Sequence, residues 1–206
     1  MASKADRKRE EILGVAEKVF AEKGYEGATL REIADGVKIK TPALYYHFRS
    51  KEELYNSLMM EIYQKLKIEV LEPIMQEGTD DPKKKIRLFT GLLFDFWSKN
   101  KRFPMIIAQE VTWGGDMVYS ELVPNFLVPM FNEMVNAVDQ KDMERHGFRK
   151  FDIPMLVFNV FGMSLFYFIA APIFTILTGE ESLSPQRIAQ LEEEIVNLVF
   201  QGIEIS

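Results

Sequence analysis

Basic side chains and polar-tipped rings gather in one short stretch of this chain. Residues 36–51 contain four basic residues and no acidic one, although the 206-residue chain carries a formal net charge of −6. Tyr45, Tyr46 and His47 follow one another inside the same stretch. Lysine and arginine neutralise phosphate charges, and tyrosine and histidine tips can reach phosphates or base edges. The stretch therefore predicts a surface that binds a polyanion, with the basic residues Lys38, Lys40, Arg49 and Lys51.

The residues around this stretch predict two short helices joined by a turn. Thr29 with Glu32 is a capping box, which starts the first helix. Residues 37–39 break its apolar spacing. Thr41 is a fair cap and Pro42 is tolerated in a first helical turn, so together they predict a second helix start. This is the helix-turn-helix arrangement, whose second helix enters a DNA major groove about 12 Å wide.

The second helix has an inner and an outer side. Leu44 and Phe48 are four residues apart and should pack inward, so the rings of residues 45–47 are left facing outward. Ser50 with Glu53 is a second capping box and starts the next helix. Charge and periodicity alone leave two interpretations open, because a basic helical hairpin can also be an ordinary solvated surface.

The order of the residues favours DNA binding. The pattern T-x-R-E-I-A-x(9)-L-Y-Y-H-F-x-S-K-E-E-L begins at Thr29 and closely resembles the N-terminal domain of the tetracycline-repressor (TetR) family. The resemblance covers about Arg7 to Leu58, and beyond that it rests on length and an all-helical pattern. It implies phosphate contacts from Thr29, Arg31 and Lys51. It also implies base-edge contacts near Lys40, Thr41, Pro42 and Ala43, and further DNA contacts from Tyr45, Tyr46 and His47.

Two positions depart from the family pattern. Lys38 lies in the turn, where the family usually has a glycine that supplies a left-handed conformation. It is either an extra phosphate contact or a strained residue, and we include it among the DNA-binding candidates. Pro42 and Ala43 replace a common Gly-Thr pair, which leaves the operator sequence open.

The whole-chain composition is that of a globular protein, with 47% hydrophobic and 27% charged residues and no cysteine. No signal-peptide pattern is present, so we expect a cytoplasmic protein. Residues 1–55 carry a net charge of +1 and the remainder −7, so only the N-terminal part suits a polyanion. We expect a DNA-binding domain over residues 1–50 and an effector-binding and dimerisation domain over residues 51–206, with the helix from Lys51 as connector.

Helical spacing predicts an all-α fold of about nine helices, beginning with a three-helix helix-turn-helix domain. The helix from Lys51 should run to about Leu71, stopped by Pro73, and residues 140–150 should form a loop or a short helix. Further helices are expected to about Asn100, over Met105–Trp113, over Leu122–Val138 with a kink or split, over Ile153–Thr178 and over Ser184–Ile203.

One segment allows a second interpretation. Residues 153–179 contain no charged residue, and about 20 apolar residues suffice to span a bilayer. Asn159, Ser164, Pro154 and Pro172 interrupt the segment, and no one-sided positive cluster flanks it. A helix that is apolar all round also fits one packed in a domain on one side and against a second subunit on the other. We favour a homodimer helix without membrane contact, and a membrane-anchored DNA-binding protein is the alternative.

The C-terminal part is rich in aromatic and methionine side chains, which form either a packed core or the wall of a ligand cavity. The family resemblance implies a repressor that binds a palindromic double-stranded operator and is released by a small hydrophobic effector. It also implies a homodimer through the last two helices, about 153–178 and 184–203. Candidate effector contacts are Trp97, Phe103, Trp113, Phe131, Phe158 and Phe161, with Gln109, Glu110 and Asn159 as polar anchors.

Enzymatic chemistry finds little support. The chain has two histidines, and the sequence contains no HExxH, phosphate loop, nucleophile elbow or Cys/His cluster. The acidic run 192–194 is better explained as a solvated helix face. We therefore expect no catalytic site, no cofactor and no metal.

Overall fold

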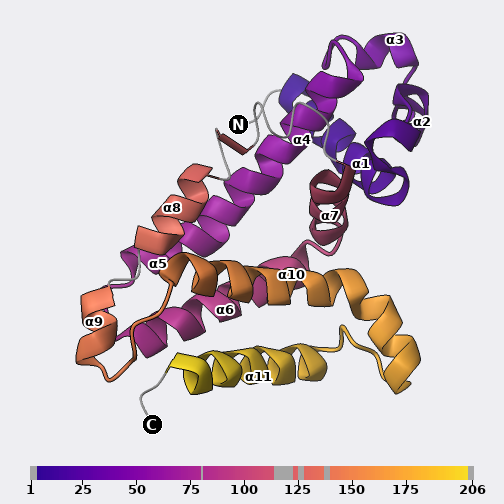
Figure 1. Cartoon of the computed structure of the whole chain (residues 1–206). Coiled ribbons are helices and arrows are strands. Elements are labelled where there is room, and N and C mark those ends of the chain that lie inside the picture. Colours follow the sequence, from indigo (N-terminus) through magenta and orange to yellow (C-terminus); the bar gives the residue numbers. More distant parts are fainter. Residues whose placement is uncertain (1–3, 80, 114–122, 125–127, 137–139, 204–206) are drawn as a thin grey trace.

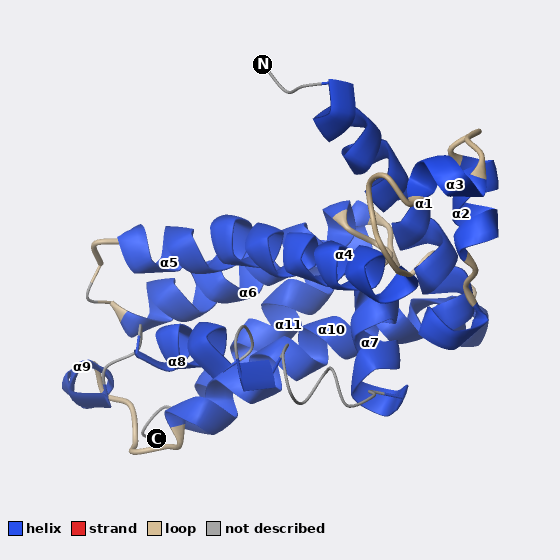
Figure 2. Ribbon diagram, turned by 90° about the horizontal axis from the view of Figure 1, so that it is seen from above, coloured by secondary structure: helices blue, strands red, loops and turns tan. Residues whose placement is uncertain are grey.

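The computed structural model describes the chain except for residues 1–3, 80, 114–122, 125–127, 137–139 and 204–206. The described residues form helices joined by turns and loops, with no strand among them (Figure 2). The all-α prediction is therefore confirmed.

The N-terminal head consists of α1 (Lys4–Gly27), α2 (Leu30–Gly36) and α3 (Thr41–Leu44) (Figure 1). Its core is made of fully buried side chains from all three helices and the loop that follows. Near its end α1 is broken at Gly24, whose φ of 70° is a conformation that glycine adopts without strain. The core residues are Ile12, Ala16, Phe20, Ile33, Ala34, Leu44 and Phe48.

A long helical column joins the head to the rest of the molecule. It begins as α4 (Lys51–Leu66), passes through the π-helical segment η1 (Lys67–Leu71) and continues as α5 (Glu72–Gln76). The prediction that Pro73 stops this helix near Leu71 is wrong. Proline lacks an N–H and crowds the carbonyl four residues back, and the wider π turn just before it accommodates both effects.

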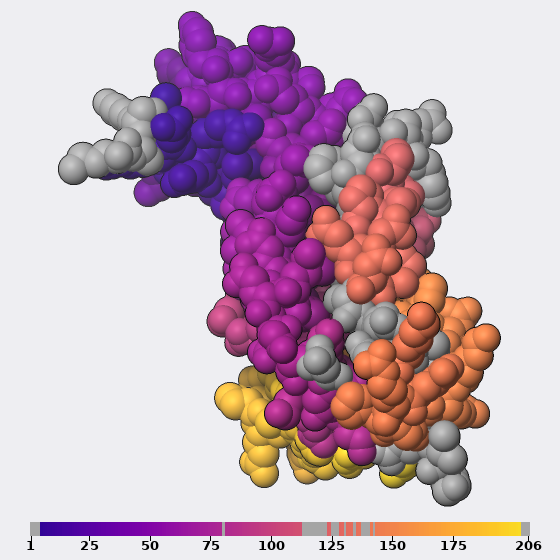
Figure 3. Space-filling view, turned by 90° about the vertical axis from the view of Figure 1, so that its left-hand side faces the viewer, coloured from indigo at the N-terminus to yellow at the C-terminus, as the bar shows by residue number. Residues whose placement is uncertain are grey.

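The body is built around α6, which packs against both α10 and α11. On another side, α8 lies beside the η1 part of the column (Figure 3). Residues 140–150, expected as a loop or short helix, contain a six-residue helix. Part of the predicted Leu122–Val138 helix lies outside the described residues. The body helices are α6 (Pro82–Lys99), α7 (Phe103–Trp113), α8 (Val128–Asn136), α9 (Gln140–Arg145), α10 (Ile153–Thr178) and α11 (Pro185–Ile203).

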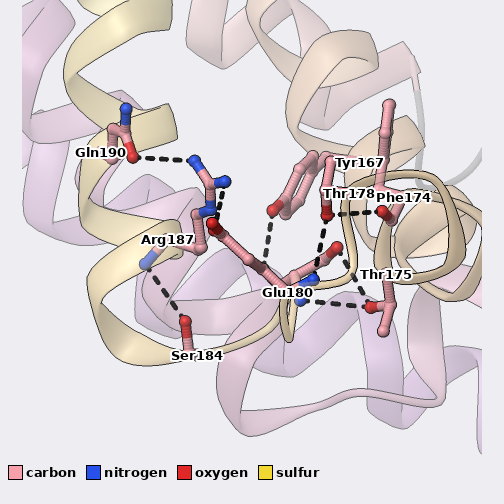
Figure 4. A network of polar contacts seen from close by, with 9 residues as sticks. Tyr167, Phe174, Thr175, Thr178, Glu180, Ser184, Arg187 and Gln190 are labelled. Carbon is pink, nitrogen blue, oxygen red and sulfur yellow. Dashed lines mark hydrogen bonds and ion pairs between the residues drawn. The ribbon is translucent and has the colours of Figure 1, made fainter.

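A network of polar contacts fixes the turn between α10 and α11 (Figure 4). The Tyr167 hydroxyl donates to the Ser182 carbonyl at 2.6 Å, and the Thr175 hydroxyl is 3.1 Å from the Ser182 hydroxyl. Arg187 on α11 forms an ion pair with Glu180 in the turn. Because these contacts tie both helices to the turn, they set the angle at which α11 returns beneath α10.

Candidate DNA-binding surface and ligand cavity

The turn between α2 and α3 is closed by two backbone hydrogen bonds. The Ile39 N–H donates to the Ala34 carbonyl at 2.9 Å, and the Lys38 N–H donates to the Asp35 carbonyl at 3.0 Å. This pairing is the Schellman motif, which ends a helix with one left-handed residue. That residue is Lys38, whose φ is 59°, the single positive φ of a non-glycine residue in the described part of the chain. Lys38 is therefore a conformationally costly turn residue, and its exposed side chain remains a candidate phosphate contact.

The start of α3 differs from the prediction by one residue. Lys40 rather than Thr41 is the N-cap, because the first turn closes through the Ala43 N–H on the Lys40 carbonyl at 2.8 Å. Thr41 is thus the first helical residue, and Pro42 lies in the first turn as predicted. The α-helical part ends at Leu44, and hydrogen-bonded turns continue the direction to Phe48.

The side chains from Leu44 to Phe48 point as predicted except for His47, which was expected to face outward with the two tyrosines. Leu44 and Phe48 are fully buried, whereas Tyr45 is 51% and Tyr46 89% exposed, and His47 is half-buried. The Arg9 guanidinium lies 4.6 Å from the Phe48 ring centroid and covers its outer face. The two exposed tyrosines therefore stand on a short, firmly anchored segment.

The capping box at the start of α2 is present. The Thr29 hydroxyl accepts from the Glu32 N–H at 3.3 Å and donates to the Glu32 carboxylate at 2.9 Å. Lys23 forms an ion pair with the same carboxylate. This contact is the largest cause that lowers the pKa of Glu32, and the hydrogen bonds from Thr29 lower it further. A phosphate contact from the Thr29 hydroxyl would therefore replace its bond to Glu32. Arg31 is 85% exposed at its side chain, with only a 3.9 Å approach to Asp35.

Lys51 joins the head to the column. Its ammonium donates to the Glu26 carbonyl at 3.3 Å and lies 4.4 Å from the Tyr25 ring centroid. At the adjacent cap, Ser50 accepts from the Glu53 N–H at 3.0 Å, as predicted. The Glu53 carboxylate accepts from the Arg49 N–H instead of returning to Ser50. Lys51 is thus half-buried and holds the end of α1 in place.

A cavity of about 670 Å³ lies among α4, α7, α8 and α10. Its described walls are almost wholly apolar, and its polar side chains are Tyr63, Glu110 and Asn132. Val111 and Phe158 are 71% and 64% exposed, so the cavity reaches the surface beside them. The lining residues are Tyr63, Leu66, Ile107, Glu110, Val111, Val128, Phe131, Asn132, Val157, Phe158, Phe161, Gly162 and Leu165.

Glu110 links the cavity to the column. One carboxylate oxygen accepts a hydrogen bond from the Tyr55 hydroxyl, and the other is buried without a hydrogen-bond partner among the described residues. Burial raises the pKa of Glu110, partly offset by the bond from Tyr55. Burial also raises the pKa of the hydroxyls of Tyr55 and Tyr63, which keeps both protonated.

Residues 12–58 match the family model described as bacterial regulatory proteins, tetR family. The head of this chain is a tetR-family domain. The chain is 31% identical over 109 residues to the transcriptional repressor NicS of Pseudomonas putida, covering 53% of this chain and 50% of NicS. The transcriptional repressor KstR2 of Mycobacterium tuberculosis is 42% identical over 59 residues, 29% of this chain and 30% of KstR2. The chain thus matches half or less of the length of these curated relatives.

Solved structures extend the likeness beyond the head, as a likeness of fold. The ketosteroid transcriptional regulator KstR2 of Mycobacterium tuberculosis superposes with a TM-score of 0.76 at 20% identity, over 96% of this chain and 95% of KstR2. AibR in complex with isovaleryl coenzyme A and operator DNA superposes with a TM-score of 0.75 at 18% identity, over 94% and 98%. The shared fold therefore covers nearly the whole chain and includes most of the 26-residue α10.

The structure brings four of the nine predicted effector contacts together at the cavity: Glu110, Phe131, Phe158 and Phe161. The other side chains with described positions lie elsewhere. Trp97 is fully buried behind the wall, donating to Ser164 at 3.2 Å, with its ring centroid 5.7 Å from that of Phe161. Phe103 is buried against Phe96.

The two remaining polar candidates also lie outside the cavity wall. Gln109 donates to the Ala21 carbonyl at 3.1 Å and so ties α7 to α1, and Asn159 is exposed. The Trp113 side chain lies outside the described residues. Tyr63 and Ile107, among other lining residues, were not among the predicted contacts, because helical spacing does not distinguish a core position from a cavity wall.

Proposed function

We propose that this protein is a ligand-responsive transcriptional repressor that binds a palindromic operator as a homodimer and is released by a small hydrophobic effector. The decisive observation is the pairing of two features in one chain. The acid-free segment 36–51, which includes the turn and α3, carries Tyr46 at 89% exposure, and an apolar cavity of about 670 Å³ lies beside the column that leads to this segment. NicS is named a repressor, and AibR was solved with both a ligand and operator DNA. Both names support the proposal.

The proposed operator contacts fall into two groups. Lys40 and the outward side chains of α3 and the turn after it meet base edges and nearby phosphates, because this exposed segment can enter a major groove. Basic and hydroxyl side chains around this segment contact the phosphate backbone of the DNA. The proposed contacts are Thr29, Arg31, Lys38, Lys40, Thr41, Pro42, Ala43, Tyr45, Tyr46, His47 and Lys51.

The homodimer is proposed from the exposed faces of α10 and α11. One row of α10, including Val157, Val160 and Phe168, is buried within the chain. Ile176 and Leu177 on the same helix are 82% and 73% exposed, an apolar surface that a second subunit would cover.

By length and composition α10 could also cross a membrane, and 28% of its most apolar 18-residue window is buried within the chain. We favour the dimer because α10 packs against α6, α7 and α8 in the fold shared with KstR2. We expect a dimer that stays in the supernatant without detergent. The double substitution Ile176→Glu with Leu177→Glu should convert this dimer to a monomer. Retention of the full chain in the membrane fraction would contradict it.

The proposed mechanism couples the two ends of the column. A dimer presents two α3 segments to successive major grooves about 34 Å apart. Residues 1–50 are the proposed DNA-binding domain and residues 51–206 the proposed effector and dimer domain, with α4 as connector in a cytoplasmic protein. An effector can act only through different affinities for the operator-competent and released states, and the contact between α7 and the column through Glu110 and Tyr55 is the proposed point of change.

Selection of bound fragments from genomic DNA, followed by titration of the recovered site, tests DNA recognition. Tyr46→Ala should strongly weaken binding without changing the dimer, and Ile68→Ala is the matched control because Ile68 is an exposed apolar residue (56%) on η1, away from the head. Recovery of no specific fragment, or wild-type affinity in Tyr46→Ala, would contradict the proposal.

A further inference from the structure

The ligand cavity contains one strong hydrogen-bond acceptor that the protein leaves partly unused. The second carboxylate oxygen of Glu110 is buried and has no hydrogen-bond partner among the described residues. The first is already bound by the Tyr55 hydroxyl. A buried ionised carboxylate is stabilised by hydrogen-bond donors, and a cationic donor stabilises it most. Whatever fills this cavity therefore gains most if it brings a charged donor to Glu110.

The other described lining residues sharpen this chemistry. None of them is lysine, arginine or histidine, so the described wall offers no cation to neutralise a carboxylate or phosphate. An anionic group held inside the cavity would lie near Glu110, and two like charges in an apolar site repel each other strongly. Burial raises the pKa of Glu110, in keeping with the one carboxylate oxygen that has no hydrogen-bond partner among the described residues.

We propose that the cavity binds an amphiphilic amine, with its ammonium group on Glu110 and its hydrocarbon part against Phe131, Phe161 and Leu165. The proposal rests on the proposed ligand-responsive function and names the class of effector. The isovaleryl coenzyme A bound to AibR belongs to AibR, and its anionic groups would find no partner on the described wall here.

Glu110 is also placed to report the ligand to the DNA-binding head. Its partner Tyr55 packs edge-on against Phe20 and Tyr25 of α1, with ring centroids 4.8 and 5.0 Å apart. The Lys51 ammonium lies over the outer part of this cluster, 4.4 Å from the Tyr25 centroid. An ammonium that draws the carboxylate away from Tyr55 would loosen the cluster that positions α1 on the column. Tyr55 is thus the proposed coupling residue and not a ligand contact.

Three probes of equal chain length test the ligand class on the full-length protein: decylamine, decanol and decanoate, each below its aggregation concentration. At neutral pH the amine is protonated, as a lysine is, and the acid is ionised. Calorimetric titration should show decylamine binding at least about tenfold more tightly than decanoate, with decanol between them, because a buried charge-assisted hydrogen bond separates the three.

Substitution of the carboxylate tests the named residue. Glu110→Gln keeps the shape and can still accept from Tyr55, so it should weaken decylamine binding about ten- to a hundredfold and leave decanol nearly unchanged. Glu133→Gln is the matched control, because Glu133 is a neighbouring carboxylate on α8 outside the cavity wall. Tyr55→Phe should keep amine binding and reduce amine-induced release of operator DNA.

Several outcomes overturn the ligand class: decanoate binding as tightly as decylamine, no binding of decylamine to wild type, or wild-type amine affinity in Glu110→Gln. The comparison of the three probes on wild type decides the matter even if Glu110→Gln fails to fold. Release of the operator by decanoate alone would refute the amine and leave the repressor function standing. Tight amine binding by a protein that selects no DNA would refute the repressor function and leave the amine as the ligand class.

Discussion

Replacing Lys38 by glycine should stabilise the free protein. Lys38 holds a φ of 59° in the Schellman turn between α2 and α3. A left-handed conformation costs a residue with a Cβ roughly 1–2 kcal/mol, and glycine avoids that cost. Glycine also loses more backbone entropy on folding, and this loss destabilises the folded state by about 0.5–1 kcal/mol. Taken at the middle of both ranges, the expected net gain is about 0.75 kcal/mol, which raises the melting temperature by about 1.5–3 °C in a domain of this size.

Lys38→Ala is the control that isolates the backbone. Both substitutions remove the same exposed charge, but alanine keeps the Cβ and therefore the strain. Thermal and urea unfolding of the two variants should show glycine more stable than alanine. Equal stability of the two variants, or a less stable glycine variant, would refute the strain interpretation of this turn.

The same pair of variants also answers whether Lys38 touches DNA. If each subunit of a dimer neutralises one phosphate with Lys38, both variants should lower the salt-dependence slope of operator binding by about 1.8. The slope is measured by titrating operator DNA at several salt concentrations. An unchanged slope would leave Lys38 as a turn residue alone.

Three further predictions concern the head, the operator and the cavity. Gly36→Ala places a Cβ 2.6 Å from Val15 Cγ1 and should cost about 1–2 kcal/mol in urea unfolding, whereas in a Val15→Ala background the loss should vanish; an equal loss in both backgrounds would exclude the clash. Tyr46→Ala should lower operator affinity at least about tenfold in a band-shift titration while the dimer persists, against an unaffected Ile68→Ala. Because burial raises the folded-state pKa of Glu110, its ionised form destabilises the fold above that pKa, and the penalty disappears as pH falls towards the ordinary glutamate value. Glu110→Gln should therefore melt higher than wild type at pH 7, and the difference should shrink on acidification; a difference independent of pH would contradict the burial of the charge.

Most local features of the head could be predicted from the sequence, because they depend on residues that are close together along the chain. The Thr29–Glu32 capping box and the burial of Leu44 and Phe48 depend on residues three or four apart, and they are present as predicted. The N-cap of α3 shifted to Lys40 because a cap is set by the backbone that leaves the Schellman turn, which residue type does not reveal. The failure at Pro73 has a similar origin, since a π turn is invisible to a pattern built on 3.6 residues per turn.

The cavity could be predicted only in part because its walls come from four helices. Aromatic residues at helical spacing look the same whether they end in the core, as Trp97 does, or at an opening, as Phe158 does. Distinguishing them requires the crossing of α7, α8 and α10, which no local pattern contains. Glu110 was predicted as a polar anchor of a ligand cavity, and the structure places it in the cavity wall.

The position of Glu110 also explains why α7 matters to both halves of the molecule. Two neighbouring residues of this helix face different partners: Gln109 binds the Ala21 carbonyl of α1, and Glu110 binds Tyr55 of α4. Because α7 contacts the head at α1 and lines the cavity at the same level, a small rotation of α7 must change both hydrogen bonds together. A ligand that holds Glu110 therefore acts on the joint between head and column directly, without a long path through the core.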